Sequence, residues 1–89
     1  MKRILGTITI FTSDRQASSA EMNRLLTENG HLIMSRLGVN VQKACVSRCP
    51  GLIILAVEGE DEKIFNLEEK LRDLPELEVK ISVMSEQAQ

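Results

Sequence analysis

Alternating apolar and polar residues predict four β-strands along the chain. The first runs from Arg3 to Thr12, with isoleucines on one face and Leu5, two threonines and Phe11 on the other. Further strands are predicted over Leu32–Val39, Leu52–Val57 and Leu77–Val83. The third is apolar on both faces, which is typical of a central strand, whereas the fourth alternates strictly and fits a sheet edge.

Apolar residues spaced three and four positions apart predict two helices. The first covers Met22–Leu26 and ends near Gly30, a residue suited to a left-handed C-terminal position. Its start is open, because Asp14 could cap the helix directly, or Ser18 could cap it as the first residue of a capping box that ends at Glu21.

The second predicted helix lies between Gly59 and Pro75. Its apolar stripe consists of Ile64, Leu67, Leu71 and Leu74. The element order is therefore strand, helix, strand, strand, helix, strand. Two right-handed βαβ crossovers then interleave, which predicts an α+β, ferredoxin-like βαββαβ sandwich with an antiparallel sheet of order 4-1-3-2 and both helices on one face. We expect a single domain over residues 1–89, with residues 85–89 as a frayed tail.

One face of such a sheet has no helices to cover it. Leu5, Phe11, part of Leu52–Val57 and either Met34 or its neighbours are expected on that face. An apolar sheet face left in water is a site of association, so we expect a homo-oligomer, a dimer or a dimer of dimers, formed face to face or by joining sheet edges. The alternative is a monomer with a modestly apolar open face.

Charge and composition narrow the function classes. The 89 residues carry a formal net charge of -2 without a strongly basic stretch, so we expect no direct nucleic-acid binding. No segment approaches the roughly 18 apolar residues of a membrane span. A single histidine, with no nucleophile–base constellation and no glycine-rich phosphate loop, indicates a protein that is not an enzyme. Two cysteines without a signal peptide favour a cytoplasmic location.

Several segments together resemble a known family. They include Asp14-Arg15, Leu52–Gly59 and, as the most specific piece, Ile33–Val39. The chain is similar along nearly its whole length to the ACT-like family of iron-only hydrogenase system regulators, and it also resembles the C-terminal ligand-binding domain of nickel-responsive repressors. The resemblance implies a regulatory role. It departs from amino-acid-binding ACT domains where Gln16 and Ala17 replace the Pro-Gly of their Asp-Arg-Pro-Gly turn.

The junction between the first strand and the first helix is a candidate ligand site. Ser13, Asp14, Arg15 and Ser18 lie where free helix N–H groups can hold a carboxylate or a phosphate. Arg36, in the second strand and expected to point away from the helices, is a further candidate for an anionic effector. The alternative is that Asp14 or Ser18 only caps the helix, while the arginines are solvated or cover apolar surface.

Cys45 and Cys49 form a C-x3-C pair in the longest predicted loop. Thiolates are soft metal ligands, and a two-fold axis would supply four of them, so the pair is a candidate metal site. The alternative is a pair of loop thiols, or a pair that oxidises to a disulfide.

Three functions follow from these observations. The first is a sensor module that binds a small ligand or a protein partner at an oligomer interface; the second is a metal- or redox-responsive protein that uses Cys45 and Cys49; the third is a structural subunit without a ligand. The cofactor, if any, and the effector stay unidentified at this level.

Overall fold

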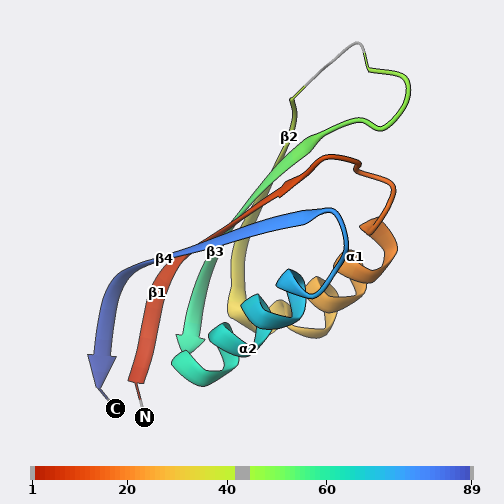
Figure 1. Ribbon diagram of the computed structural model, residues 1–89. Helices are drawn as coiled ribbons and strands as arrows, with labels where there is room; N and C mark the ends of the chain where they lie inside the picture. Colours follow the sequence, from red (N-terminus) through yellow and green to blue (C-terminus); the bar gives the residue numbers. More distant parts are fainter. Residues whose placement is uncertain (1, 42–44, 89) are drawn as a thin grey trace.

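β1 (Lys2–Thr12) lies in the middle of a four-stranded sheet, between β3 (Gly51–Glu60) and β4 (Leu77–Ala88). The computed structural model describes residues 2–41 and 45–88. β2 (Ile33–Asn40) pairs with the outer side of β3, so the order is β2-β3-β1-β4 and every neighbouring pair is antiparallel. The predicted order 4-1-3-2 is therefore confirmed (Figure 1).

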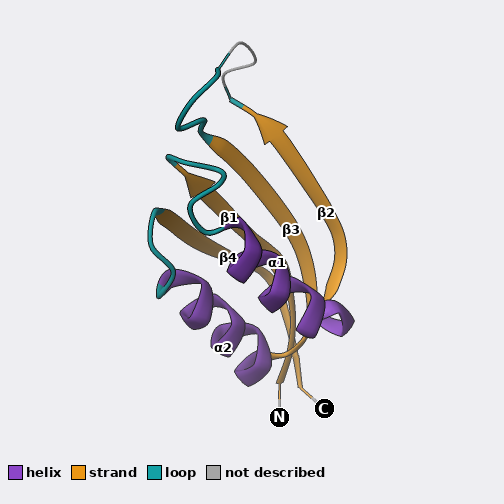
Figure 2. Ribbon diagram, turned by 90° about the vertical axis from the view of Figure 1, so that its right-hand side faces the viewer, coloured by secondary structure: helices purple, strands orange, loops and turns teal. Residues whose placement is uncertain are grey.

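Helices α1 (Ser19–Glu28) and α2 (Asp61–Arg72) both cover the same face of the sheet (Figure 2). Period-two alternation in β1 and β3 sends every second side chain toward them, and these apolar residues meet the stripes of the two helices. The resulting core contains Ile4, Ile8, Ile10, Met22, Leu25, Leu26, Leu32, Leu55, Val57, Ile64, Leu67, Leu71 and Val79. Because no tryptophan or tyrosine is present, aliphatic packing alone fills the space between sheet and helices.

Two local predictions are wrong at the ends of elements, the conformation of Gly30 and the reach of the second helix to Leu74. Gly30 opens a short 3-10 helix, η1 (Gly30–Leu32), instead of adopting a left-handed conformation, and β2 begins only after it. Leu74 packs against the core from the turn after α2, which ends at Arg72. Leu32 is thus buried, and Leu74 partly buried, from connections that lead into or out of the helical layer.

Of the expected tail over residues 85–89, residues 85–88 belong to β4, which continues to Ala88, and residue 89 lies outside the described residues. A bulge in the β1–β4 pairing lies at Met84: Gly6 pairs with Val83, whereas the preceding Leu5 pairs with Ser85. Beyond the bulge the pairing resumes and reaches Lys2 opposite Ala88. Unpaired main-chain groups at the N-terminal end of β1 are satisfied by this extension, which is why the chain stays in the sheet.

The face of the sheet opposite the helices carries the expected apolar side chains, among threonines and charged residues. It contains Leu5 and Phe11 of β1, Leu52 and Ile54 of β3, and Leu37 and Val39 of β2, which pair with Ile54 and Leu52. Met34 falls in a bulge of the β2–β3 pairing, so the neighbours of Met34 supply the β2 part of this surface. We refer to these six side chains as the open face.

An ion pair between Arg3 and Glu58 lies at the Leu5 end of the open face. Nε and Nη2 of Arg3 donate to the Glu58 carboxylate at 2.8 and 2.6 Å. This hydrogen bonding lowers the pKa of Glu58 from its ordinary value of 4.5, so the pair is charged at neutral pH. None of the described helices has the length and hydropathy that a membrane span requires.

Gly6 is the position in β1 where the sheet tolerates no side chain. A Cβ there would lie 2.2 Å from the main-chain oxygen of Ser82 in β4. We expect Gly6→Ala to lower the free energy of unfolding by about 1–3 kcal/mol, because overpacking against main chain forces strands apart.

Gly38→Ala is the matched control, since a Cβ at Gly38 meets no atom within 4 Å. Urea denaturation of the two variants measures the difference. Equal losses in both would show that the close approach of β1 and β4 does not limit this position.

Candidate functional site

The β1–α1 connection is held by main-chain and side-chain hydrogen bonds on both of its sides. Thr12 Oγ1 donates to the Asp14 carbonyl at 2.8 Å, and the Gln16 N–H donates to Asp14 Oδ1 at 3.1 Å. The Arg15 N–H donates to the carbonyl of Cys49, 34 residues along the chain, at 2.7 Å. The turn is therefore tied to the loop that carries the cysteines.

Ser13 and Ser18 face a different part of the molecule. Ser18 is buried, and its hydroxyl donates to the Pro75 carbonyl at 2.5 Å instead of capping α1. The Ser13 hydroxyl donates to the Glu76 carboxylate. Both serines thus fasten the β1–α1 connection to the α2–β4 connection, and the capping box that Ser18 could have opened does not form.

Arg36 points toward the helices, contrary to the prediction. It pairs opposite Leu55, whose side chain is in the core, and its Nη2 donates to Asn23 Oδ1 of α1 at 2.9 Å. The reason is the bulge at Met34, which shifts the alternation of β2 by one residue. The arginine consequently spans the space between the outermost strand and α1.

A hollow of about 330 Å³ opens between α1 and the strands β2 and β3. We call it the anion groove. Its lining residues are Thr12, Arg15, Ser19, Met22, Asn23, Arg36, Gly38, Val39, Gly51, Leu52 and Ile53. Two arginines thus line it, and none of these described lining residues carries a carboxylate. In a chain of formal net charge -2, this is a local concentration of positive charge.

Arg15 reaches the anion groove because Gly51 has no side chain. A Cβ on Gly51 would lie 2.7 Å from Cγ and 2.8 Å from Cδ of Arg15. The methylenes of the arginine therefore lie directly on the first residue of β3, and Arg15 and Gly51 border the groove together. Neither Gly51 nor Asn23 was singled out as a site residue by sequence reasoning, since both act through contacts made only in the folded chain.

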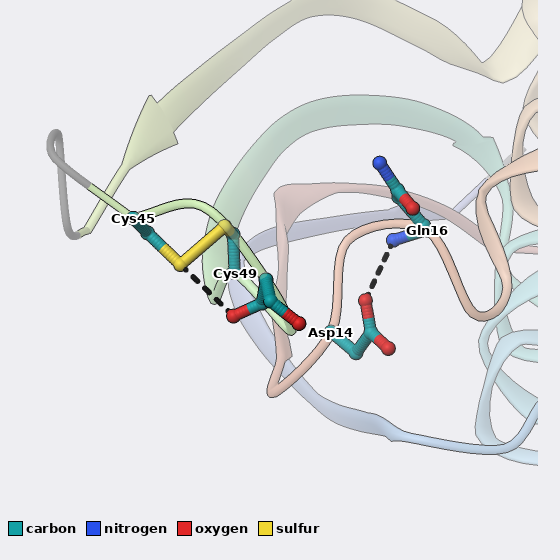
Figure 3. The surroundings of a disulfide bond; sticks show 5 residues. Asp14, Gln16, Cys45 and Cys49 are labelled. Atoms are coloured by element: carbon teal, nitrogen blue, oxygen red, sulfur yellow. Dashed lines mark hydrogen bonds between the residues drawn. A yellow bond between two sulfur atoms is a disulfide. The ribbon is translucent and has the colours of Figure 1, made fainter.

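Cys45 and Cys49 are joined by a disulfide, with their Cα atoms 5.6 Å apart (Figure 3). A metal site needs thiolates, so this oxidised form is not a metal-binding form. Among residues 2–41 and 45–88, no group of three or more histidine, cysteine, aspartate or glutamate side chains is placed to hold a metal ion. The oxidised pair is one of the alternatives that the sequence leaves open.

The disulfide loop borders a second hollow, of about 380 Å³, which Arg15 also lines. Asp14, Arg15, Gln16 and residues 46–49 line it. Arg48, in a left-handed conformation, lies 3.9 Å from the Glu76 carboxylate. Of the predicted ligand residues, Arg15 and Arg36 meet at the anion groove, Asp14 and Arg15 meet at the second hollow, and Ser13 and Ser18 line neither.

Comparison with known proteins agrees with this architecture. Residues 3–81 match the TM1266-like family, described as "Iron-only hydrogenase system regulator, putative". The chain belongs to this family. The resemblance carried by segments such as Ile33–Val39 is thereby confirmed. No curated protein matches the chain.

Solved structures place this TM1266-like chain among ACT and PII-like folds. The uncharacterized protein TM1266 from Thermotoga maritima superposes with a TM-score of 0.81 at 23% identity, over 93% of this chain and 99% of that one. The ACT domain of GTP pyrophosphokinase from Chlorobium tepidum gives 0.70 at 16% identity, over 90% and 99%. CPII, a nitrogen regulatory PII-like protein from Thiomonas intermedia K12, gives 0.56 at 15% identity, over 100% and 98%. At these identities the likeness shows the fold alone.

A substitution at Ser18 distinguishes two roles of its hydroxyl, as an N-cap of α1 or as a hydrogen-bond donor to the Pro75 carbonyl. Aspartate is a strong N-cap but cannot donate, so we expect Ser18→Asp to lower the free energy of unfolding by about 1–3 kcal/mol through loss of the bond to the Pro75 carbonyl. Ser19→Ala, one residue along, should stay within about 0.5 kcal/mol of the parent chain. A stable Ser18→Asp variant in thermal denaturation would instead assign Ser18 a capping role.

Proposed function

We propose that this chain is a non-catalytic regulatory module that binds a small anionic effector in the anion groove and assembles as a homo-oligomer. The observation that carries the proposal is the pairing of Arg15 and Arg36 around one hollow without an acidic side chain among its described lining residues. Arginine forks suit carboxylates and phosphates, which accept two parallel hydrogen bonds.

The contacts of Arg36 support binding over a purely structural role. Its bond to Asn23 holds one guanidinium nitrogen, Nη2, and leaves the rest of the fork for a ligand. Asn23 and Ser19 add neutral polar groups at the N-terminal half of α1, where the helix dipole favours negative charge. An anion in the groove would therefore meet two cations and the positive end of a helix.

The family and the fold neighbours support the class of function. The family description assigns regulation of an iron-only hydrogenase system, and we take this as the proposed cellular context. The CPII structure is described as bound to ADP, AMP and bicarbonate, all of which are anions. A regulator of this fold class that responds to a small anion is consistent with both.

The open face supports assembly with a second copy. The open face exposes three large apolar side chains: Phe11 is 37% exposed, Leu37 57% and Val39 43%. Contact of such a cluster with water is unfavourable in free energy, and burial against a partner removes it. Glu78 and Lys80 of β4 flank the cluster on the same face, opposite Phe11 and Thr9. Opposite charges on one surface allow a two-fold pairing in which each copy neutralises the other.

The open face and the anion groove share residues of the sheet. Val39 and Leu52 pair across β2 and β3 on the open face, and both also border the groove. An effector that changes the geometry of this strand pair would bind two quaternary arrangements with different affinities. Such a difference is the requirement for regulation by a shift between them.

Binding is tested by titration with inorganic phosphate, ADP and dicarboxylates, followed by thermal shift and calorimetry. We expect at least one of these anions to raise the melting temperature, and Arg36→Gln to weaken its binding about tenfold or more through loss of a charge-assisted contact. Arg24→Gln is the control, because Arg24 lies on α1 but pairs with Glu21 and Glu28 and does not line the groove. An equal loss in both variants, or no response to any anion, would contradict the proposed site.

Assembly is tested by sedimentation velocity over a range of concentrations. We expect a dimer or a dimer of dimers. Its dissociation constant should rise about tenfold or more in Phe11→Glu, because a charge replaces a ring that the second copy buries. Phe65→Glu on α2 is the matched control, since Phe65 is 43% exposed on the helical side. A parent chain that sediments as a monomer at high concentration would refute assembly through the open face.

A further inference from the structure

The cysteine pair is open to small molecules. Both Cys45 and Cys49 are partly exposed, and Cys49 borders the second hollow together with Arg48. A hollow of about 380 Å³ is large enough for a small thiol to approach the bond. Arg48, the neighbour of Cys49 in the chain, lines the same hollow and adds a positive charge to it, which favours the thiolate form of a nearby cysteine.

A purely stabilising role explains this disulfide poorly. The two cysteines are four residues apart, and a crosslink that closes so short a loop constrains the unfolded chain less than one that closes a long loop. The bond shapes the turn from Cys45 to Cys49 instead. Cys45 Sγ lies 3.2 Å from the Ser47 carbonyl oxygen; because a disulfide sulfur carries no hydrogen, this contact becomes a hydrogen bond only in the reduced thiol (Figure 3).

The shaped turn acts on Arg15. The Cys49 carbonyl accepts the N–H of Arg15 at 2.7 Å, and Gly51, two residues after Cys49, is the surface on which the Arg15 methylenes lie. The geometry of the disulfide loop is thus connected to the backbone and the side chain of one groove arginine. Figure 3 shows the Asp14–Gln16 turn beside the disulfide.

We infer that Cys45 and Cys49 are a redox-active pair that a dithiol reduces, and that reduction releases Arg15 and weakens anion binding in the groove. The weakening of anion binding rests on the proposed function. The reduction of the cysteine pair and the release of Arg15 do not depend on it.

The chemistry is thiol–disulfide exchange. A thiolate of the dithiol attacks one sulfur of the pair, a mixed disulfide forms, and the other sulfur leaves as a thiolate. The second thiol of the reductant then attacks its own sulfur in the mixed disulfide and frees the remaining protein thiolate. The protein gains two electrons and, after protonation, two hydrogens, while the dithiol becomes a cyclic disulfide.

Reduction and release are tested on the full chain with excess dithiothreitol. Alkylation and mass spectrometry count the free thiols, and amide hydrogen exchange by NMR follows Arg15. We expect both cysteines to be alkylated and exchange at Arg15 to accelerate about tenfold or more, because its acceptor is no longer held in place. The Asn29 amide, bonded to Leu25 at the far end of α1, is the internal control and should not change.

Coupling to the groove is tested by phosphate affinity in both redox states. We expect the dissociation constant to rise about threefold or more on reduction, and the Cys45→Ser, Cys49→Ser double variant to match the reduced chain and ignore dithiothreitol. A pair that resists reduction, or an Arg15 amide that exchanges equally in both states, overturns the inference. If exchange at Arg15 accelerates on reduction but the dissociation constant for phosphate does not change, the coupling between the disulfide and the groove is overturned. If neither state binds phosphate, the proposed function loses support for this ligand, and hydrogen exchange still decides the release of Arg15.

Discussion

The pairing of β1 with β3 on one side and β4 on the other is the interaction on which the rest of the structure depends. Each strand of this trio contributes buried side chains to the helical face, including Ile8, Leu55 and Val79. Gly6 lets β4 approach so closely that its main chain occupies the space of a Cβ. With only aliphatic residues to fill the core, this close approach is what gives the sheet the shape onto which both helices pack.

The length of the sheet relative to its helices creates the candidate sites. The molecule extends 48 Å along its longest axis and only 19 and 17 Å along the others. α1 covers ten residues, and β2 and β3 run past it toward the cysteine loop (Figure 1). The anion groove opens where the strands continue beside the start of the helix. The same asymmetry brings Arg15 and Arg36, from the turn after β1 and from β2, to one place.

Periodicity was sufficient to predict the fold, because the signals that define it are local. The alternation in β1 and the stripe of Ile64, Leu67 and Leu71 are readable in the chain itself, and the strand order follows from which strands are apolar on both faces. Bulges are not readable in this way. The bulge at Met34 reverses the direction of Arg36, and the bulge at Met84 carries β4 past its predicted end.

The candidate site was predictable in composition but not in arrangement. Arg15 and Arg36, predicted as ligand residues, both line the anion groove, and their role in binding stays a prediction. Ser13 and Ser18 were attributed to the same place because they lie at the strand–helix junction, where free helix N–H groups can hold an anion. Their actual partners, Glu76 and Pro75, lie more than fifty residues away and are brought close only by the α2–β4 turn.

The extension of β4 has a consequence for how such a module can be built into larger proteins. Lys2 and Ala88 pair with each other, so the two ends of the described chain leave the sheet side by side (Figure 1). Neighbouring ends are the geometry that tolerates insertion into a surface loop of a host, or cyclic rearrangement of the chain order. A host carrying this unit inside a loop would need almost no spacer, and mechanical tension between its flanks would peel β1 from β4 one residue pair at a time.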